Sequence, residues 1–181
     1  MFDGYLTEAR FDDELVRVLL GVQEGELGSS APGSTGVALP AAGEFEPPHG
    51  AFLVAVDGGA AVGCGAVRLL EPRIGELQRL YVAPPFRRGG AGRMLLTALE
   101  GRAVVLGCER LRLDTDGRGP ALALFRAEGY EPIADYNGNP HARFWFEKQL
   151  TASVDRPRTV FTNPRGEPLP RTDGGPDAGS A

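Results

Sequence analysis

Residues 76–100 read ELQRLYVAPPFRRGGAGRMLLTALE, and this stretch decides the fold. Residues 76–82 are typical of a strand, which ends before the two prolines at positions 84 and 85. A glycine-rich turn follows, and between Gly92 and Gly107 the apolar residues recur at helical spacing. The stretch is therefore predicted to form a strand, a tight loop and a helix.

The loop between this strand and helix, Arg87-Arg88-Gly89-Gly90-Ala91-Gly92, has the composition of an anion-binding site. Glycines let the backbone approach a ligand, and a helix N-terminus presents unpaired N–H groups and the positive end of the dipole. Such a loop holds a phosphate or pyrophosphate, and the two arginines add charge and forked donors. It is neither a Walker A loop, which would end in Gly-Lys-Ser/Thr, nor a Rossmann G-x-G-x-x-G loop near the first strand.

The flanking sequence completes one domain over residues 1–150. Apolar spacing predicts an early helix, and an Asp-Gly-Gly turn joins two strands upstream of the loop. The order indicates an α+β (α/β) domain with a mixed sheet. The last 31 residues, with five prolines, four glycines and no apolar period, are predicted to be a disordered tail. The expected elements are a helix at 15–22, strands at 51–56, 61–70 and 76–82, a helix at 92–107, a strand at 111–114, a helix at 120–128 and strands at 130–135 and 142–148.

Charge and composition narrow the classes of partner. The net charge of −5 argues against nucleic acid, whereas residues 79–93 hold four arginines and no acid, which indicates an anionic ligand. Two distant cysteines and two isolated histidines predict no metal site. No apolar run reaches the roughly 18 residues of a membrane span, and the acidic N-terminus is unlike a secretory signal. We therefore expect a cytoplasmic protein without a membrane partner.

These motifs resemble the GNAT acyltransferase superfamily, whose Q/R-x-x-G-x-G/A signature is matched by Arg87-x-x-Gly90-x-Gly92. The strand before the loop resembles the family's fourth strand, and residues 111–133 resemble its second conserved block. The resemblance covers about residues 45–150. It implies a GNAT-like mixed, mostly antiparallel sheet flanked by helices, with a V-shaped splay between strands 4 and 5.

The resemblance also implies acetyl-CoA as the cosubstrate. Backbone N–H groups of residues 88–93 would cradle the pyrophosphate, the backbone of residues 80–82 would pair with the pantetheine, and the splay would hold the thioester. Arg87 and Arg88 would lie near the phosphates. The residues so expected at the cofactor are Leu80, Tyr81, Val82, Arg87, Arg88, Gly89, Gly90, Ala91, Gly92, Arg93 and Phe125.

Glu76 is the candidate catalytic residue, because some members of the family carry a carboxylate base at this offset from the signature. A base is needed because an alkyl ammonium, with a pKa of about 10.4, cannot attack a thioester while protonated. The alternative is a solvated acid at a strand end. Phe125 stands where the family often has a tyrosine that protonates the leaving sulfur, and it has no proton to give. Water, Tyr130 or Tyr136 are other sources of that proton.

The sequence thus predicts an N-acetyltransferase that moves an acetyl group from acetyl-CoA to a primary amine by direct attack in a ternary complex. The acceptor is a small-molecule or peptide amine that the sequence does not name, and residues 23–50 and 135–142 are the loops expected to select it. A non-catalytic acyl-CoA-binding sensor or partner domain is the alternative, and a third hypothesis assigns a partner to the tail. The fold is also compatible with a homodimer paired through the C-terminal strands.

Overall fold

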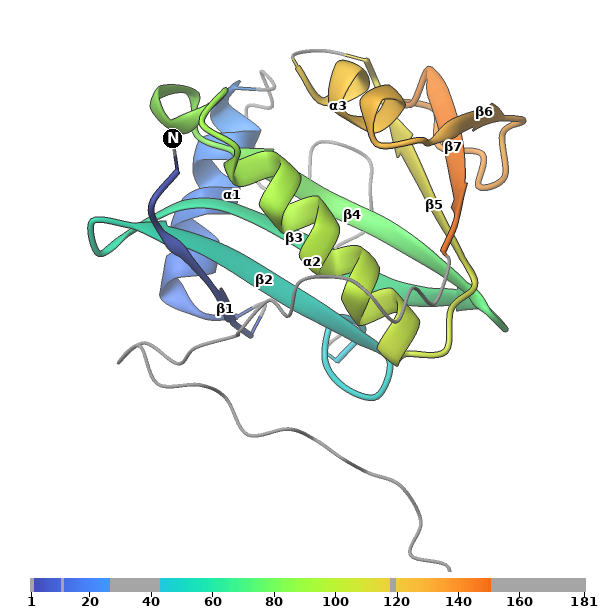
Figure 1. The fold of residues 1–181 in the computed structure, drawn as a ribbon, viewed down its shortest axis with the longest axis horizontal. Helices are drawn as coiled ribbons and strands as arrows, with labels where there is room; N and C mark the ends of the chain where they lie inside the picture. The colour runs from blue at the N-terminus through green and yellow to red at the C-terminus, as the bar shows by residue number, and fades with distance from the viewer. Residues whose placement is uncertain (1, 11, 27–42, 118–119, 151–181) are drawn as a thin grey trace, which may run out of the picture.

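The computed structural model describes residues 2–10, 12–26, 43–117 and 120–150. Its strands form one seven-stranded sheet in the order β1-β2-β3-β4-β5-β7-β6 (Figure 1). All neighbouring strands are antiparallel except the parallel pair β4–β5. The elements are β1 Tyr5–Glu8, α1 Glu14–Glu26, β2 Gly50–Asp57, β3 Ala60–Glu71, β4 Ile74–Val82, the 3₁₀ turn η1 Pro84–Phe86, α2 Ala91–Val105, β5 Arg110–Thr115, α3 Ala121–Ala127, β6 Glu131–Ile133 and β7 Phe144–Gln149.

Two helices cover opposite faces of the sheet. Helix α2 packs against β2, β3 and β4, and its Leu95 and Leu99 lie in one buried cluster with Leu77, Leu111 and other apolar residues of the strands. Helix α1 packs on the other face, where Val16 joins a second buried cluster over β2 and β3. Figure 1 shows α2 in front of the sheet and α1 behind it. Because strand residues alternate between faces, each position of the sheet belongs to one of these two environments.

Strand β4 contains a β-bulge near Arg79, between Glu76 and the loop at 87–92. The pairing of β3 with β4 passes from Cys64↔Tyr81 to Ala66↔Gln78, so β4 carries one extra residue there. Arg79 adopts a left-handed backbone conformation with φ of 57°, which bends the strand. The bulge lies opposite Gly65, where a Cβ would stand 2.6 Å from a methyl group of Leu99. A glycine is therefore required at this point of β3 for α2 to pack closely.

Strands β4 and β5 separate soon after they meet. Their register contains three pairs, from Ile74↔Arg110 to Glu76↔Arg112. Beyond Glu76, β4 continues to Val82 and pairs with β3; within the described residues, no strand pairs with its other edge there. This is the V-shaped opening predicted between strands 4 and 5.

The structure confirms the predicted fold class and adds elements that the sequence analysis missed. The missed elements are the four-residue edge strand β1 and the turn η1. The last two strands were predicted too long, since β6 has three residues and β7 begins at Phe144. The predicted tail, residues 151–181, lies outside the described residues. None of the helices in the described part of the chain is long and apolar enough to cross a membrane.

Candidate active site

A row of charged side chains crosses the sheet on the face opposite α2. Arg68 on β3 pairs with Glu76 on β4, Glu76 with Arg112 on β5, and Arg112 with Glu147 on β7. Their neighbours in sequence, such as Leu77 and Leu111, point into the cluster under α2, so the charged residues share the other face. The signs alternate along the row, and Glu76 occupies its centre, where β4 and β5 part.

Glu76 is a buried carboxylate with donors on both oxygens. Its side chain is 3% exposed. Oε2 accepts hydrogen bonds from Arg68, whose Nε lies at 2.9 Å, and from Gln78 Nε2 at 2.6 Å. Oε1 accepts from the Tyr136 hydroxyl at 2.9 Å and more weakly from Asn137 Nδ2 at 3.5 Å. A carboxylate offers about four acceptor positions, so the Asn137 contact is the one that a ligand displaces most easily.

Two residues of the loop between β6 and β7, Tyr136 and Asn137, donate hydrogen bonds to this carboxylate. The Asn137 amide also donates to Asp114, and its Oδ1 accepts from the indole nitrogen of Trp145 at 3.0 Å. Asn139 Nδ2 donates to the other oxygen of Asp114 at 3.1 Å. The Tyr136 ring lies beside the Arg112 guanidinium, 5.5 Å from ring centroid to Cζ. The loop therefore reaches Glu76 by side chains held on both β5 and β7.

Burial perturbs two acids beside Glu76. Removal from water raises the pKa of the Tyr136 hydroxyl well above its ordinary value, and the negative charge of Glu76 raises it further. Burial also raises the pKa of the Asp114 carboxyl, although hydrogen bonds from Asn137 and Asn139 oppose the shift. Tyr136 thus keeps its proton at neutral pH, and its hydroxyl donates a hydrogen bond to Glu76.

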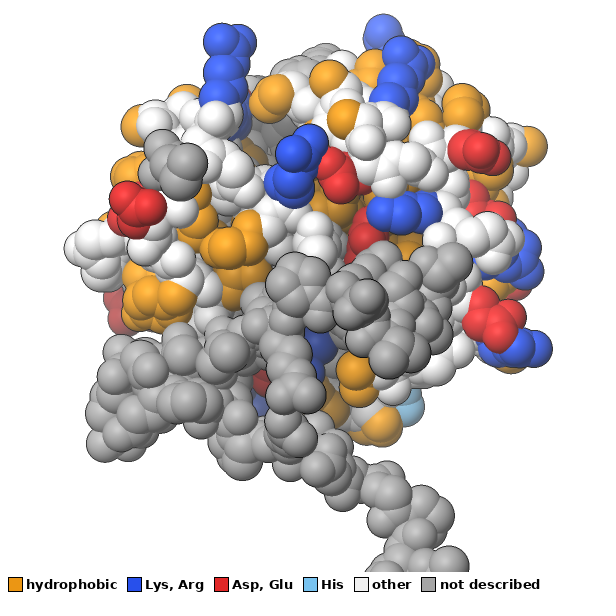
Figure 2. Space-filling model, in the orientation of Figure 1, with side chains coloured by type: hydrophobic (Ala, Val, Ile, Leu, Met, Phe, Trp, Pro, Cys, Tyr) orange, Lys and Arg blue, Asp and Glu red, His pale blue; other side chains and the backbone are white. Residues whose placement is uncertain are grey.

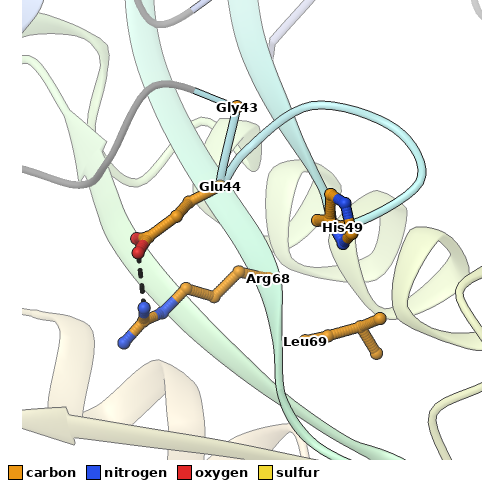
Figure 3. Close-up of a pocket in the computed structure, with 5 residues that line it drawn as sticks. All are labelled: Gly43, Glu44, His49, Arg68 and Leu69. Atoms are coloured by element: carbon orange, nitrogen blue, oxygen red, sulfur yellow. Dashed lines mark hydrogen bonds and ion pairs between the residues drawn. The ribbon is translucent and has the colours of Figure 1, made fainter.

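A pocket of about 300 Å³ is lined in part by Arg68, the arginine that also donates to Glu76. Its lining residues come from the segment before β2 and from β3 (Figure 3). Arg68 Nη1 lies 3.1 Å from Glu44 Oε2, the contact drawn as a dashed line in Figure 3, so one guanidinium joins the pocket to the buried carboxylate. The lining residues are Gly43, Glu44, His49, Arg68 and Leu69.

The start of α2 has the features of an anion-binding site. Gly90, at the N-cap, has a φ of 104° that a residue with a Cβ rarely adopts, and no side chain in the described part of the chain caps the helix. The first turn has no acid, so its amides and dipole keep their attraction for an anion. Arg88 and Arg93 are exposed. Figure 2 shows Lys and Arg side chains over the upper part of this face, where Figure 1 places the beginning of α2 and helix α3.

Arg87 lies in this loop, but its side chain is directed toward α1. Its Nε donates to the Val82 carbonyl at 2.7 Å and its Nη2 to Glu26 at 2.6 Å. Tyr81 donates to the same Glu26 carboxylate at 3.0 Å. The hydrogen bond from Arg87 lowers the pKa of Glu26. Arg87 thus ties the last residue of α1 to the end of β4, and the expectation that it also approaches a phosphate stays a prediction.

Comparisons with known proteins agree on one family. The family model described as "Acetyltransferase (GNAT) family" matches residues 7–130. The chain belongs to the GNAT acetyltransferase family. A relative from Azospirillum brasilense, named an IAA acetyltransferase, is 38% identical over 55% of this chain and 67% of its own length. The YsnE N-acetyltransferase of Bacillus subtilis (strain 168), whose function is uncharacterised, is 32% identical over 56% of this chain and 71% of its own length.

Solved structures of GNAT proteins share the fold. One from Klebsiella pneumoniae, assigned as an acyl-CoA N-acyltransferase, superposes with a TM-score of 0.68 at 28% identity and covers 83% of this chain and all of its own. A phosphinothricin acetyltransferase from Sinorhizobium meliloti, solved with acetyl-CoA, has a TM-score of 0.63 at 21% identity and covers 87% and 94%. The protein is thus an acetyltransferase of the GNAT family, and acetyl-CoA is the cosubstrate of that family.

Two buried residues, Phe125 and Cys64, bear on the chemistry of the site. Phe125 on α3 is 4% exposed and packs against Tyr130 and Phe146 in the cluster under α2, so its expected contact with the cofactor stays a prediction. Cys64 is fully buried, and burial raises the pKa of its thiol to about 12. A thiol in this state is a poor nucleophile, which argues against an acyl-cysteine intermediate.

The sequence analysis proposed Glu76 as the base but did not predict three of its hydrogen-bond partners. Arg68, Gln78 and Asn137 come from three places in the chain, and none belongs to a motif. One signal was available: a turn centred on Pro72 places Arg68 opposite Glu76, as the register shows. The contact of Tyr136 with Glu76 depends on a loop path that no local pattern specifies.

Proposed function

We propose that the protein transfers an acetyl group from acetyl-CoA to a primary amine, with Glu76 as the base. The observation that carries the proposal is the buried Glu76 carboxylate at the point where β4 and β5 part. The amine would attack the thioester directly in a ternary complex, and the closeness of the two reactants would supply much of the rate. Glu76 would remove the proton that keeps the amine from attacking.

The geometry supports a binding mode for each substrate. The backbone of Gly89, Gly90 and Gly92 and the exposed Arg88 and Arg93 would hold the pyrophosphate, and the unpaired edge of β4 at 80–82 would hold the pantetheine. The amine would approach Glu76 on the face of the sheet opposite α2, from the pocket that Arg68 lines. The net charge of −5 supports a small-molecule or peptide acceptor over nucleic acid. A cytoplasmic location is part of the proposal.

Thiol release from acetyl-CoA, measured with a panel of primary amines, tests the proposal. We expect at least one amine to raise the rate above that of acetyl-CoA alone. If no amine does so although CoA binds tightly, the alternative of a non-catalytic acyl-CoA-binding domain is favoured, consistent with the missing phenol at Phe125.

Replacement of Glu76 tests the base. Glu76→Gln should lower the rate at neutral pH by about a hundredfold or more and leave CoA affinity nearly unchanged. The deficit should shrink as the pH approaches about 10, because the amine is then already deprotonated. Glu100→Gln is the matched control, since Glu100 is also buried and pairs with Lys148 at 2.7 Å on the other side of the sheet. An equal rate for Glu76→Gln and wild type would show that Glu76 is not the base.

A further inference from the structure

The proposed reaction needs a proton for the leaving sulfur, and α3 does not supply one. A thiol has an ordinary pKa of about 8.5, so the thiolate that leaves acetyl-CoA takes up a proton near neutral pH. The residues of α3, Ala121–Ala127, include no phenol, thiol or imidazole. Phe125 packs in the apolar cluster with Tyr130 and Phe146. The proton therefore comes either from water or from a side chain on another element.

Of the four tyrosines, Tyr136 is the one that donates a hydrogen bond to Glu76. Tyr5 lies on the edge strand β1, Tyr81 donates to Glu26, and Tyr130 packs on Phe125 in the apolar cluster. Tyr136 donates to Glu76 Oε1 at 2.9 Å.

The position of Tyr136 also suits transfer to a thioester in the splay. Its ring lies beside Arg112 on β5 while its hydroxyl reaches Glu76 on β4. Glu76 and Arg112 form the last pair before the two strands separate, so the phenol spans the closed end of the splay. The opening that receives the thioester begins at this point.

We propose that Tyr136 is a second catalytic residue, which passes a proton from Glu76 to the sulfur of the departing CoA. This inference rests on the proposed amine acetylation. The amine reacts in its neutral form, after Glu76 has passed the ammonium proton to water. The amine nitrogen then forms the new N–C bond while the C–S bond breaks and its electron pair stays on sulfur. Glu76 takes the excess proton from nitrogen, Tyr136 gives its proton to sulfur, and the proton on Glu76 replaces it on the Tyr136 oxygen. The products are the amide and the neutral thiol, and Glu76 is an anion again.

The charged groups around Tyr136 favour its neutral form, which is the form that the proposed proton transfer restores. Glu76 and Asp114 place negative charge near the phenol, and Arg112 places positive charge beside its ring. Burial and the Glu76 charge raise the pKa of Tyr136, so the phenol holds its proton between turnovers. Because it receives one proton as it releases another, no tyrosinate accumulates.

Tyr136→Phe tests the role, because it removes the hydroxyl and retains the ring beside Arg112. Binding is read without any acceptor, as the affinity for CoA and for desulfo-CoA, which lacks the sulfur. We expect the variant to bind CoA about two- to tenfold more weakly and desulfo-CoA as tightly as wild type. Tyr5→Phe is the control, since it loses a phenol on the opposite edge of the sheet. Equal effects of Tyr136→Phe on both ligands, or no effect on either, would overturn the proposal.

The rate gives the second readout. With an amine that wild type acetylates, Tyr136→Phe should lower kcat about tenfold or more at neutral pH and change the KM of the amine little. An unchanged kcat overturns the role of Tyr136 and leaves the amine acetylation standing. Failure of wild type to acetylate any amine contradicts the proposed function instead, and the comparison of CoA with desulfo-CoA still decides whether Tyr136 meets the sulfur.

Discussion

At the scale of single residues, the site depends on keeping a carboxylate charged in a buried place. Moving a charged group out of water costs several kcal/mol unless partners offset the loss. Arg68 supplies that offset for Glu76 through two nitrogens, at 2.9 and 2.8 Å from Oε2. The same arginine pairs with Glu44 in the pocket, so it is shared between the base and the region expected to receive the acceptor.

Arg68→Gln should therefore destabilise the protein by about 3 kcal/mol, the low end of the range for breaking a buried pair, because Arg68 is partly exposed. Urea denaturation measures the loss. The double variant Arg68→Gln with Glu76→Gln should recover part of it, because no buried charge is then left alone. Arg110→Gln is the control, since Arg110 makes a looser surface pair with Glu147 and should cost at most about 1 kcal/mol. Equal losses for Arg68→Gln and its control would contradict the account.

At the scale of elements, the bulge in β4 and the glycines of β3 set how closely α2 approaches the sheet. Gly65 faces Leu99 of α2, which is fully buried. A Cβ on Gly63 would stand 2.8 Å from the Tyr81 carbonyl oxygen. Since α2 begins at the anion site, its distance from the sheet also fixes where that site lies relative to the edge of β4.

Gly65→Ala should destabilise the protein by about 1–3 kcal/mol, because the Leu99 side chain cannot move aside in a packed core. Gly101→Ala on α2 is the matched control. No atom of the described residues lies within 4 Å of the added methyl group there. Alanine favours a helix over glycine by about 0.5–1 kcal/mol, so that variant should be stabilised. Thermal denaturation compares the two. Destabilisation of both variants to the same extent would show that the close contact between β3 and α2 has no special weight.

The sequence was most informative where local pattern decides structure. The loop at 87–92 and helix α2 were predicted because glycine, proline and apolar spacing act within a few residues. Strand β1 was missed because four residues at a sheet edge carry almost no periodicity. The surroundings of Glu76 depend on cross-strand register, and the shift between Leu69 and Glu71 changes which residues face each other. Apart from the Arg68–Glu76 pair, which the turn at Pro72 indicates, no local pattern specifies these pairings.

At the scale of the whole molecule, Leu150 is the last described residue and belongs to the folded core. Its backbone N–H donates to the Glu109 carbonyl at 2.7 Å, and its side chain is 8% exposed in the cluster under α2. These contacts join the end of β7 to the segment before β5. Among the described residues, β7 is held by its full register with β5 and by its pairing with β6. These contacts support our proposal that residues 1–150 form the domain and residues 151–181 form a tail.

A chain truncated after Leu150 should keep the melting temperature and the CoA affinity of the full chain, because the sheet and the site residues are all retained. A chain truncated after Lys148 is the control. It loses the Leu150 side chain, whose burial contributes about 2 kcal/mol, and should melt at least about 4 °C lower. If the first truncation also lowers the melting temperature or CoA affinity, residues 151–181 contribute to the folded domain. If it changes neither but abolishes binding to a partner, the tail carries that interaction.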